Sequence, residues 1–239
     1  ANPNKRTTYK TIGQGDLIYI YDGLFRDANE LLNSPIQSAG TSMMAGDARY
    51  VDVNGDGAIT DEDMIYDNKP RSAIMQWGIP FSLQWKAWSL EGLLQGSGRQ
   101  YGILHNNIKG TGWNKIYYKD QLDIYYPGNE NARYPRADND YGVWNGEYNR
   151  AASALWRVNK TYARLKNLSI TYNFKYKLLK HVNWLSAASV SLTGTNLFTI
   201  CPSLKYGDPE TGPINDTATV QTAAYPTTRT FSVMVNLGF

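Results

Sequence analysis

The feature that most constrains the fold of this chain is a two-residue alternation that continues to its last residue. In the final segment, RTFSVMVNLGF, one set of positions is apolar throughout: Phe231, Val233, Val235, Leu237 and Phe239. The intervening positions are Ser232, Met234, Asn236 and Gly238. Successive side chains of a β-strand point to opposite faces of its sheet, so this period predicts a strand with two unlike faces.

Four further runs repeat the alternation upstream. Two of them, KNLSITYNF and ASVSLTGTN, carry polar faces that are uncharged and rich in hydroxyl groups. The other two, within WGIPFSLQWKAWSLEGLLQG, are predicted to form a hairpin that turns at residues 86–87, between Trp85 and Trp88, and Leu93 breaks the alternation of its second strand. The apolar positions of these runs are Leu168, Ile170, Tyr172, Phe174, Val190, Leu192, Trp77, Ile79, Phe81, Leu83, Trp85, Trp88, Leu90 and Leu94.

The connections between these runs are of two lengths. The turns at 86–87 and 175–187 are shorter than the segments 97–160 and 199–227. An up-and-down barrel of the outer membrane has short periplasmic turns and long extracellular loops. If the C-terminus is periplasmic, counting the strands backward places every short turn on the periplasmic side and residues 52–63 on the extracellular side.

Composition narrows the possible partners and environment. The net charge is +3, from 24 basic and 21 acidic residues without a basic stripe, so no nucleic-acid partner is expected. The 18 Tyr and 7 Trp residues favour strands, wet interfaces, sugar-stacking surfaces or membrane girdles. No stretch approaches the roughly 20 apolar residues of a membrane-spanning helix. The chain is therefore either soluble or enters a membrane as strands.

No catalytic residues are predicted. The two histidines do not form a zinc-binding motif, and GSGRQYG lacks the spacing of a nucleotide-binding loop. The single Cys201 excludes an internal disulfide. The acidic residues of the long central segment are read as solvated loop charges, so we do not expect an enzyme.

One stretch, DVNGDGAITDED at residues 52–63, follows the spacing of a calcium-binding loop. Oxygen-bearing residues recur at every second position from its start, and Gly57 stands where such a loop turns sharply. The predicted ligands are the side chains of Asp52, Asn54, Asp56 and Asp63, the backbone carbonyl of Ala58, and Thr60 directly or through water. The alternative is an empty loop that keeps its shape by Asx-turn hydrogen bonds.

The predicted calcium ion has a structural role. Calcium sensors and buffers flank such loops with helices and usually carry them in pairs, whereas this loop is single and its neighbours are not predicted to be helical. Ile59 is expected to point away from the ion and to anchor the loop in apolar surroundings. The twelfth position holds Asp63 where the pattern has Glu.

Several stretches, in their order and spacing, resemble the SusC/RagA-like TonB-dependent transporters of the Gram-negative outer membrane. They are GDARYVDVNGDGAITDEDM, SLEGLLQGSGRQ, NARYPR, YARLKNLSITYNF, VSLTGTNLF, DPE and YPTTRTFSVMVNLGF. The resemblance implies an all-β fold in which residues 1–239 are the C-terminal portion of an antiparallel transmembrane β-barrel. It also implies import of glycans or oligopeptides with energy from TonB, and a SusD-like surface lipoprotein as partner.

Five strands cannot close a membrane barrel, which needs at least eight. The remaining strands, the plug and the segments that contact TonB are therefore expected elsewhere, in the same or another chain. The rival hypothesis is a secreted, calcium-stapled β-sandwich that binds carbohydrate. The aromatic C-terminus, Phe239, separates the two, because barrel-assembly machinery is expected to read it and a sandwich has no need of it.

The barrel hypothesis predicts how individual residues are placed relative to the membrane. Trp85, Trp88 and Phe239 should lie near the periplasmic interface. The residues expected to face lipid are Leu168, Ile170, Val190, Leu192, Val233 and Val235. No substrate-binding residue is assigned, although eight aromatic residues could line an external vestibule: Trp113, Tyr117, Tyr118, Tyr125, Tyr126, Tyr141, Trp144 and Tyr148.

Overall fold

The computed structural model describes residues 15–37, 43–103, 122–136, 148–149, 151–174, 184–204, 208–210 and 227–239. The chain divides into two compact units. The first contains residues 1–72, 101–158 and 213–223, and the second contains residues 73–100, 159–212 and 224–239. None of the helices in the described ranges has the length and apolarity needed to cross a membrane.

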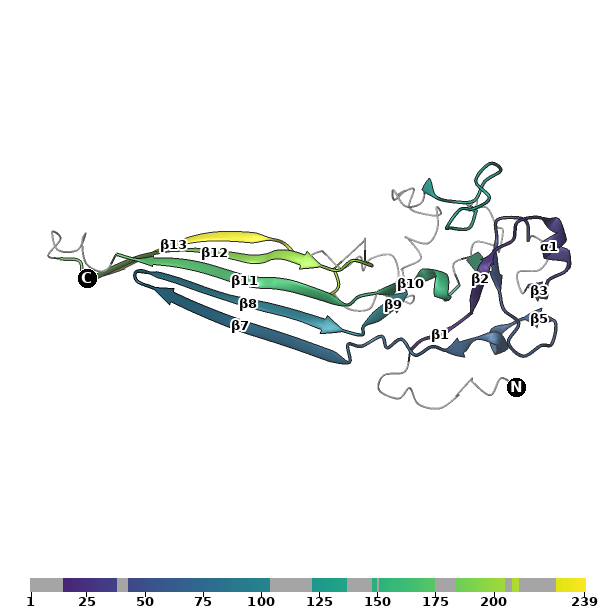
Figure 1. Cartoon of the computed structure of the whole chain (residues 1–239), viewed down its shortest axis with the longest axis horizontal. Helices are drawn as coiled ribbons and strands as arrows, with labels where there is room; N and C mark the ends of the chain where they lie inside the picture. The colour runs from purple at the N-terminus through teal and green to yellow at the C-terminus, as the bar shows by residue number, and fades with distance from the viewer. Residues whose placement is uncertain are drawn as a thin grey trace. The chain divides into compact units, whose positions relative to one another are not determined.

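The second unit is built on one five-stranded antiparallel sheet, in which the long strands lie side by side (Figure 1). The strand order is β13-β12-β11-β8-β7. The strands are β7 (Met75–Trp85), β8 (Trp88–Gly98), β11 (Tyr162–Asn173), β12 (Ala187–Ile200) and β13 (Thr230–Gly238). All five runs predicted from the alternation are therefore strands of one sheet.

The predicted hairpin joins β7 to β8 without a register shift. Trp85 pairs with Trp88 across the turn, and Lys86 has the positive φ of 53° that such a tight turn requires. Leu93 does not disturb the strand. It lies on the polar face with Glu91 and Gln95, whereas Leu90 and Leu94 lie on the apolar face.

The two faces of the sheet differ as the sequence predicts. The six residues expected on one face do share it, because Ile170 pairs with both Leu90 and Leu192, and Val190 pairs with Val235. The opposite face carries a ladder of hydroxyl groups, in which Ser169 bonds Thr193 at 3.0 Å and Thr171 bonds Ser191 at 2.8 Å. The apolar face is exposed: relative exposure is 37% for Ile170, 50% for Leu192, 71% for Val233 and 60% for Val235.

A bulge in β11 changes the phase of the alternation. Leu165 pairs with Leu94 and Asn167 pairs with Leu93, so Lys166 is an extra residue in β11. Because of this insertion, Tyr162 and Arg164 lie on the polar face together with Asn167. Without the bulge, the alternation of Leu168 and Ile170 would place Tyr162 and Arg164 on the apolar face.

Two glycines of β8 make room for aromatic rings of β7. An added Cβ at Gly92 would lie 2.3 Å from the Phe81 ring, and one at Gly96 would lie 2.4 Å from the Trp77 ring and from the Tyr162 carbonyl oxygen. Gly92 pairs with Phe81 and Gly96 with Trp77, so each ring covers the glycine opposite to it.

The first unit consists of short elements. They are β1 (Leu17–Ile18), β2 (Tyr21–Leu24), α1 (Ala28–Leu32), β3 (Ile36–Gln37), β4 (Ala48–Tyr50), β5 (Ala58–Ile59), the 3-10 turn η2 (Asp61–Asp63), β6 (Ile65–Tyr66), β9 (Tyr101–Ile103), the 3-10 turn η4 (Ala154–Trp156) and β10 (Arg157–Asn159). The pairs β1–β6 and β2–β4 are antiparallel, and β3–β5 is parallel. The carboxylate of Asp27 caps α1 by accepting from the Glu30 amide at 2.9 Å.

The core of the first unit is largely aromatic. The Tyr19 and Tyr50 rings stack with centroids 5.0 Å apart, and the Tyr50 and Tyr148 centroids lie 4.8 Å apart. Ala48 and Ile59 complete this cluster. Burial raises the pKa of all three tyrosines, which therefore stay protonated. A second small cluster joins Ile18, Ile103 and Trp156, with Tyr134 stacked on Trp156 at 5.5 Å.

Candidate functional site

The predicted calcium loop is a series of side-chain-capped turns. The Asp52 carboxylate accepts from the amides of Gly55 at 2.7 Å and Gly57 at 2.8 Å. Asn54 accepts from the Asp56 amide, and Asp56 from the Ala58 amide, both at 2.9 Å. Gly55 and Gly57 have φ angles of 75° and 83°, the left-handed conformation that favours glycine.

The loop is anchored at its end by a buried carboxylate. Asp63 is fully buried and accepts from the amides of Thr60 at 2.7 Å and Val53 at 2.9 Å. Thr60 and Asp63 form a capping box around η2. Ile59 is fully buried in the aromatic core, as predicted, and the Tyr19 hydroxyl donates to Asp61 at 3.0 Å.

The acidic side chains of the predicted loop do not come together as metal ligands. Hydrogen bonds from the Gly57 amide and then the Gly55 amide lower the pKa of Asp52, so this carboxylate is ionised at neutral pH. Asn54 and Asp56 are exposed and can turn. In the described ranges, however, no three acidic, histidine or cysteine side chains meet closely enough to hold a metal. The arrangement also matches the alternative of a loop shaped by Asx turns.

A partly buried ion pair connects two sequence motifs in the first unit. The Arg136 guanidinium, in NARYPR, donates to Asp47 at 2.7 Å, and its amide donates to the Gly46 carbonyl at 2.8 Å. Asn149 also donates to Asp47 at 2.8 Å. Because Asp47 and Gly46 begin the stretch that contains the predicted calcium loop, these contacts fix two separate motifs to each other. None of these four residues was predicted from the sequence to make such contacts.

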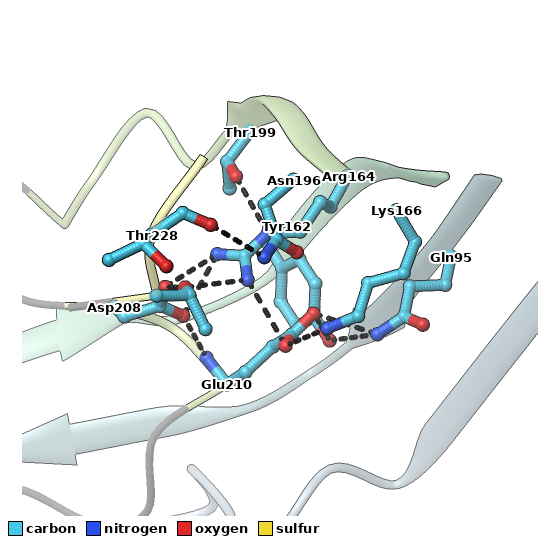
Figure 2. A network of polar contacts seen from close by, with 10 residues as sticks. Gln95, Tyr162, Arg164, Lys166, Asn196, Thr199, Asp208, Glu210 and Thr228 are labelled. Atoms are coloured by element: carbon cyan, nitrogen blue, oxygen red, sulfur yellow. Dashed lines mark hydrogen bonds and ion pairs between the residues drawn. The ribbon is translucent and has the colours of Figure 1, made fainter. Parts of the chain in front are cut away.

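The second unit contains a polar network on the polar face of the sheet (Figure 2). Arg164 is at its centre, with a side chain that is 3% exposed. The guanidinium donates to both carboxylate oxygens of Asp208, at 2.9 and 2.8 Å. It also donates to Thr199 at 2.7 Å and to Thr227 at 3.0 Å. Arg164 of β11 is thereby bonded to Thr199 of β12, to Asp208 in the segment after β12, and to Thr227 just before β13.

Glu210 is the second acid of this network. It lies 2.7 Å from the Lys166 ammonium and 3.1 Å from the Arg164 guanidinium. Its other carboxylate oxygen accepts from Gln95 at 2.7 Å and from the Tyr162 hydroxyl at 3.3 Å. The two acids and two bases balance, so the network as a whole is neutral. Asp208 and Glu210 belong to the DPE motif, whose contacts could not be predicted from the sequence.

The network adjoins a cavity of about 550 Å³ on the same face. Sheet register explains the position, because Gln76, Ser97 and Tyr162 form one transverse row and Gly78, Gln95 and Arg164 form the next. The lining residues are Gln76, Trp77, Gly78, Leu93, Gln95, Gly96, Ser97, Gln100, Tyr162, Pro209 and Glu210. The lining is therefore rich in amide and hydroxyl groups.

The proposed aromatic vestibule is described only in part. Tyr148 belongs to the buried core, and the Tyr125 hydroxyl donates to the Arg26 carbonyl at 3.2 Å. Tyr126 is exposed. The other five, Trp113, Tyr117, Tyr118, Tyr141 and Trp144, lie outside the described residues.

The chain is an all-β structure of antiparallel sheets, and its fold is similar to that of part of a β-barrel transporter. Among solved structures it is similar to chains of the RagAB peptide importer. The open-open state matches with 18% identity over 94% of this chain and 22% of that chain, at a TM-score of 0.66. A second RagAB peptide transporter structure and the closed-closed state each match at 18% identity over 97% of this chain and 24% of theirs, with TM-scores of 0.67 and 0.63.

The chain thus spans about a quarter of the length of those transporter chains. No protein-family model matches the sequence, and no curated protein is significantly similar to it. The similarity therefore establishes the fold.

Proposed function

We propose that this chain forms the last strands of an outer-membrane transporter of the SusC/RagA-like type, which imports glycans or oligopeptides with energy from TonB. A SusD-like surface lipoprotein is the proposed partner. The remaining strands, the plug and the TonB-contacting segments are proposed to lie elsewhere, in the same or another chain.

The observation that carries the proposal is the two-faced sheet of the second unit. Its polar face is hydrogen-bonded through a hydroxyl ladder, and its apolar face carries exposed branched and aromatic residues. A transmembrane barrel needs this arrangement, because lipid covers the outside and water or polar groups fill the inside. The similarity to the RagAB importer over almost the whole chain supports the same function.

The rival β-sandwich would need a second sheet packed on the apolar face. Within the described ranges, the second unit forms one sheet whose apolar residues remain exposed. This arrangement favours the transporter.

For the loop at residues 52–63, the proposed ligand is a structural calcium ion held by Asp52, Asn54, Asp56, Ala58, Thr60 and Asp63. Calcium would supply the positive charge that balances the clustered carboxylates. The support is the loop spacing, the two left-handed glycines and the ionised Asp52. The Asp52 and Asp56 side chains would have to turn toward the ion.

The decisive experiment is extraction of the full-length protein from its native membranes. A transporter should sediment with the outer membrane and remain monodisperse only in detergent, because its apolar face is covered by lipid. A protein that is released by washing and stays monodisperse in plain buffer would refute the transporter and support the sandwich.

A further inference from the structure

The cavity on the polar face of the second unit exists because one strand position has no side chain. Gly78 lies between Gln76 and Pro80 on that face of β7 and pairs with Gln95 of β8. A Cβ added at Gly78 would meet only the Leu93 side chain, at 3.7 Å. The hollow over Gly78 is therefore open space, bounded by side chains of the neighbouring transverse rows.

The groups around this hollow are neutral and polar. Gln76, Gln95 and Gln100 present amides, and Ser97 and Tyr162 present hydroxyls. Amides and hydroxyls can each donate and accept hydrogen bonds. Gln76 makes no side-chain hydrogen bond to any other described residue, so both ends of its amide remain available to a ligand within the part of the chain that the structure describes.

Glu210 is the single charged residue in the lining, and two basic side chains neutralise its charge. Glu210 contacts Lys166 at 2.7 Å and Arg164 at 3.1 Å, and it also accepts from Gln95 and Tyr162. The carboxylate is thus engaged by four groups of the protein and adds no net charge to the lining (Figure 2). A ligand with a free ammonium or carboxylate would find no unpaired opposite charge among these groups.

From this lining we infer that the cavity is a subsite for an uncharged saccharide unit. Sugar hydroxyls match the amides and hydroxyls of the lining, and the apolar faces of sugar rings suit Leu93, Pro209 and the Tyr162 ring. The cavity volume lies within the range of roughly 300–1,000 Å³ typical of small-molecule sites. The inference rests on the proposed import function and chooses the glycan over the oligopeptide at this position.

The test is calorimetric titration of the full-length transporter, purified in detergent with its partner. The probes are maltotriose, cellotriose and mannotriose, with trialanine blocked at both ends as the peptide probe. Gly78→Leu fills the hollow, and Gln76→Ala removes one amide. Ser82→Leu and Gln84→Ala are the matched controls, because both positions lie on the same face of β7, farther along the strand.

At least one trisaccharide should bind the wild type. Gly78→Leu should abolish binding, Gln76→Ala should weaken it about tenfold, as expected for one lost hydrogen bond, and both controls should bind as the wild type does. Binding that is insensitive to Gly78→Leu would overturn the subsite. Binding of blocked trialanine alone, lost in Gly78→Leu, would overturn the saccharide assignment.

The outcomes separate this inference from the proposed function. If the protein requires detergent and binds none of the trisaccharides, the subsite is wrong and the transporter stands. If the protein is monodisperse without detergent, the transporter is wrong, and the titrations then decide the subsite independently.

Discussion

Arg164 is a buried charged residue that holds several segments of the second unit together. Its guanidinium makes two contacts with Asp208 and one each with Thr199 and Thr227. Taking an ion pair out of water is costly, and good geometry with further hydrogen bonds is needed to offset that cost. The sequence does not reveal this pair, because Arg164 and Asp208 are separated by an entire strand and a connection.

Substitution Arg164→Met should destabilise the folded protein by about 3–5 kcal/mol, because Asp208 would remain buried after losing the Arg164 guanidinium. Urea unfolding of the full-length protein in detergent measures this loss. Combining Arg164→Met with Asp208→Asn should recover part of it, since the negative charge of the buried carboxylate is then absent.

Arg229→Ala is the matched control for Arg164→Met. Arg229 is exposed, and exposed charged residues contribute little to stability. Equal unfolding free energies for the two single variants would mean that the buried pair does not stabilise the fold.

At the loop of residues 52–63, the double variant Asp52→Ala and Asp56→Ala should lower the calcium content of the purified protein to background. Both carboxylates are proposed ligands, and removing them leaves too few charged oxygens to hold the ion. Elemental analysis measures the result. Glu62→Ala is the control, because Glu62 is an exposed acid within the loop and outside the proposed ligand set.

Unchanged calcium content in the double variant would show that Asp52 and Asp56 do not hold the ion. Absence of calcium from the wild-type protein would favour a loop that keeps its shape by the Asx-turn hydrogen bonds of Asp52, Asn54 and Asp56.

At the scale of elements, the alternation was sufficient to locate all five long strands. It predicted the β7–β8 hairpin and the shared face of Ile170, Leu192 and Val233, because a two-residue period maps directly onto the two faces of a sheet. It could not predict the bulge at Lys166, since an inserted residue depends on what lies opposite in the neighbouring strands. Leu93, which breaks the period, instead lines the cavity.

Charge on the two faces of β13 should have unequal effects. Val233→Arg places a guanidinium on the apolar face and should cost about 2–4 kcal/mol if that face meets lipid near the bilayer midplane. Ser232→Arg, on the polar face opposite Thr193, should cost little. The amount of folded protein in outer-membrane fractions measures the difference, and equal amounts of the two variants would contradict a lipid-facing surface.

Within the β7–β8 hairpin, Gly96→Ala should destabilise the sheet by about 1–3 kcal/mol, the usual cost of overpacking. The new methyl group would lie 2.4 Å from both the Trp77 ring and the Tyr162 carbonyl oxygen. Gly78→Ala is the control on the paired strand, where the nearest side chain is 3.7 Å away. Thermal unfolding should therefore separate the two variants, and coincident transitions would show that Trp77 relaxes without cost.

In the whole molecule, several of the motifs that carry the family resemblance contact one another. NARYPR meets the start of the calcium-loop stretch through Arg136 and Asp47, and DPE meets YARLKNLSITYNF through Asp208 and Arg164. The order of motifs predicted the class of fold, whereas these pairings could not be predicted because they join residues far apart in the chain.

The division into two compact units leads to a prediction about metal removal. The loop of residues 52–63 belongs to the first unit, where Ile59 packs in the aromatic core and Asp63 is buried. The proposed ion would draw the loop carboxylates together and its removal would leave them to repel one another, so chelation of the full-length protein should increase amide hydrogen exchange in residues 43–66. Exchange in β7, β8, β11, β12 and β13 should not change, because their hydrogen bonds lie within the sheet of the second unit. Faster exchange throughout both units would assign the ion a role in global stability, and unchanged exchange in both would argue against a structural calcium ion.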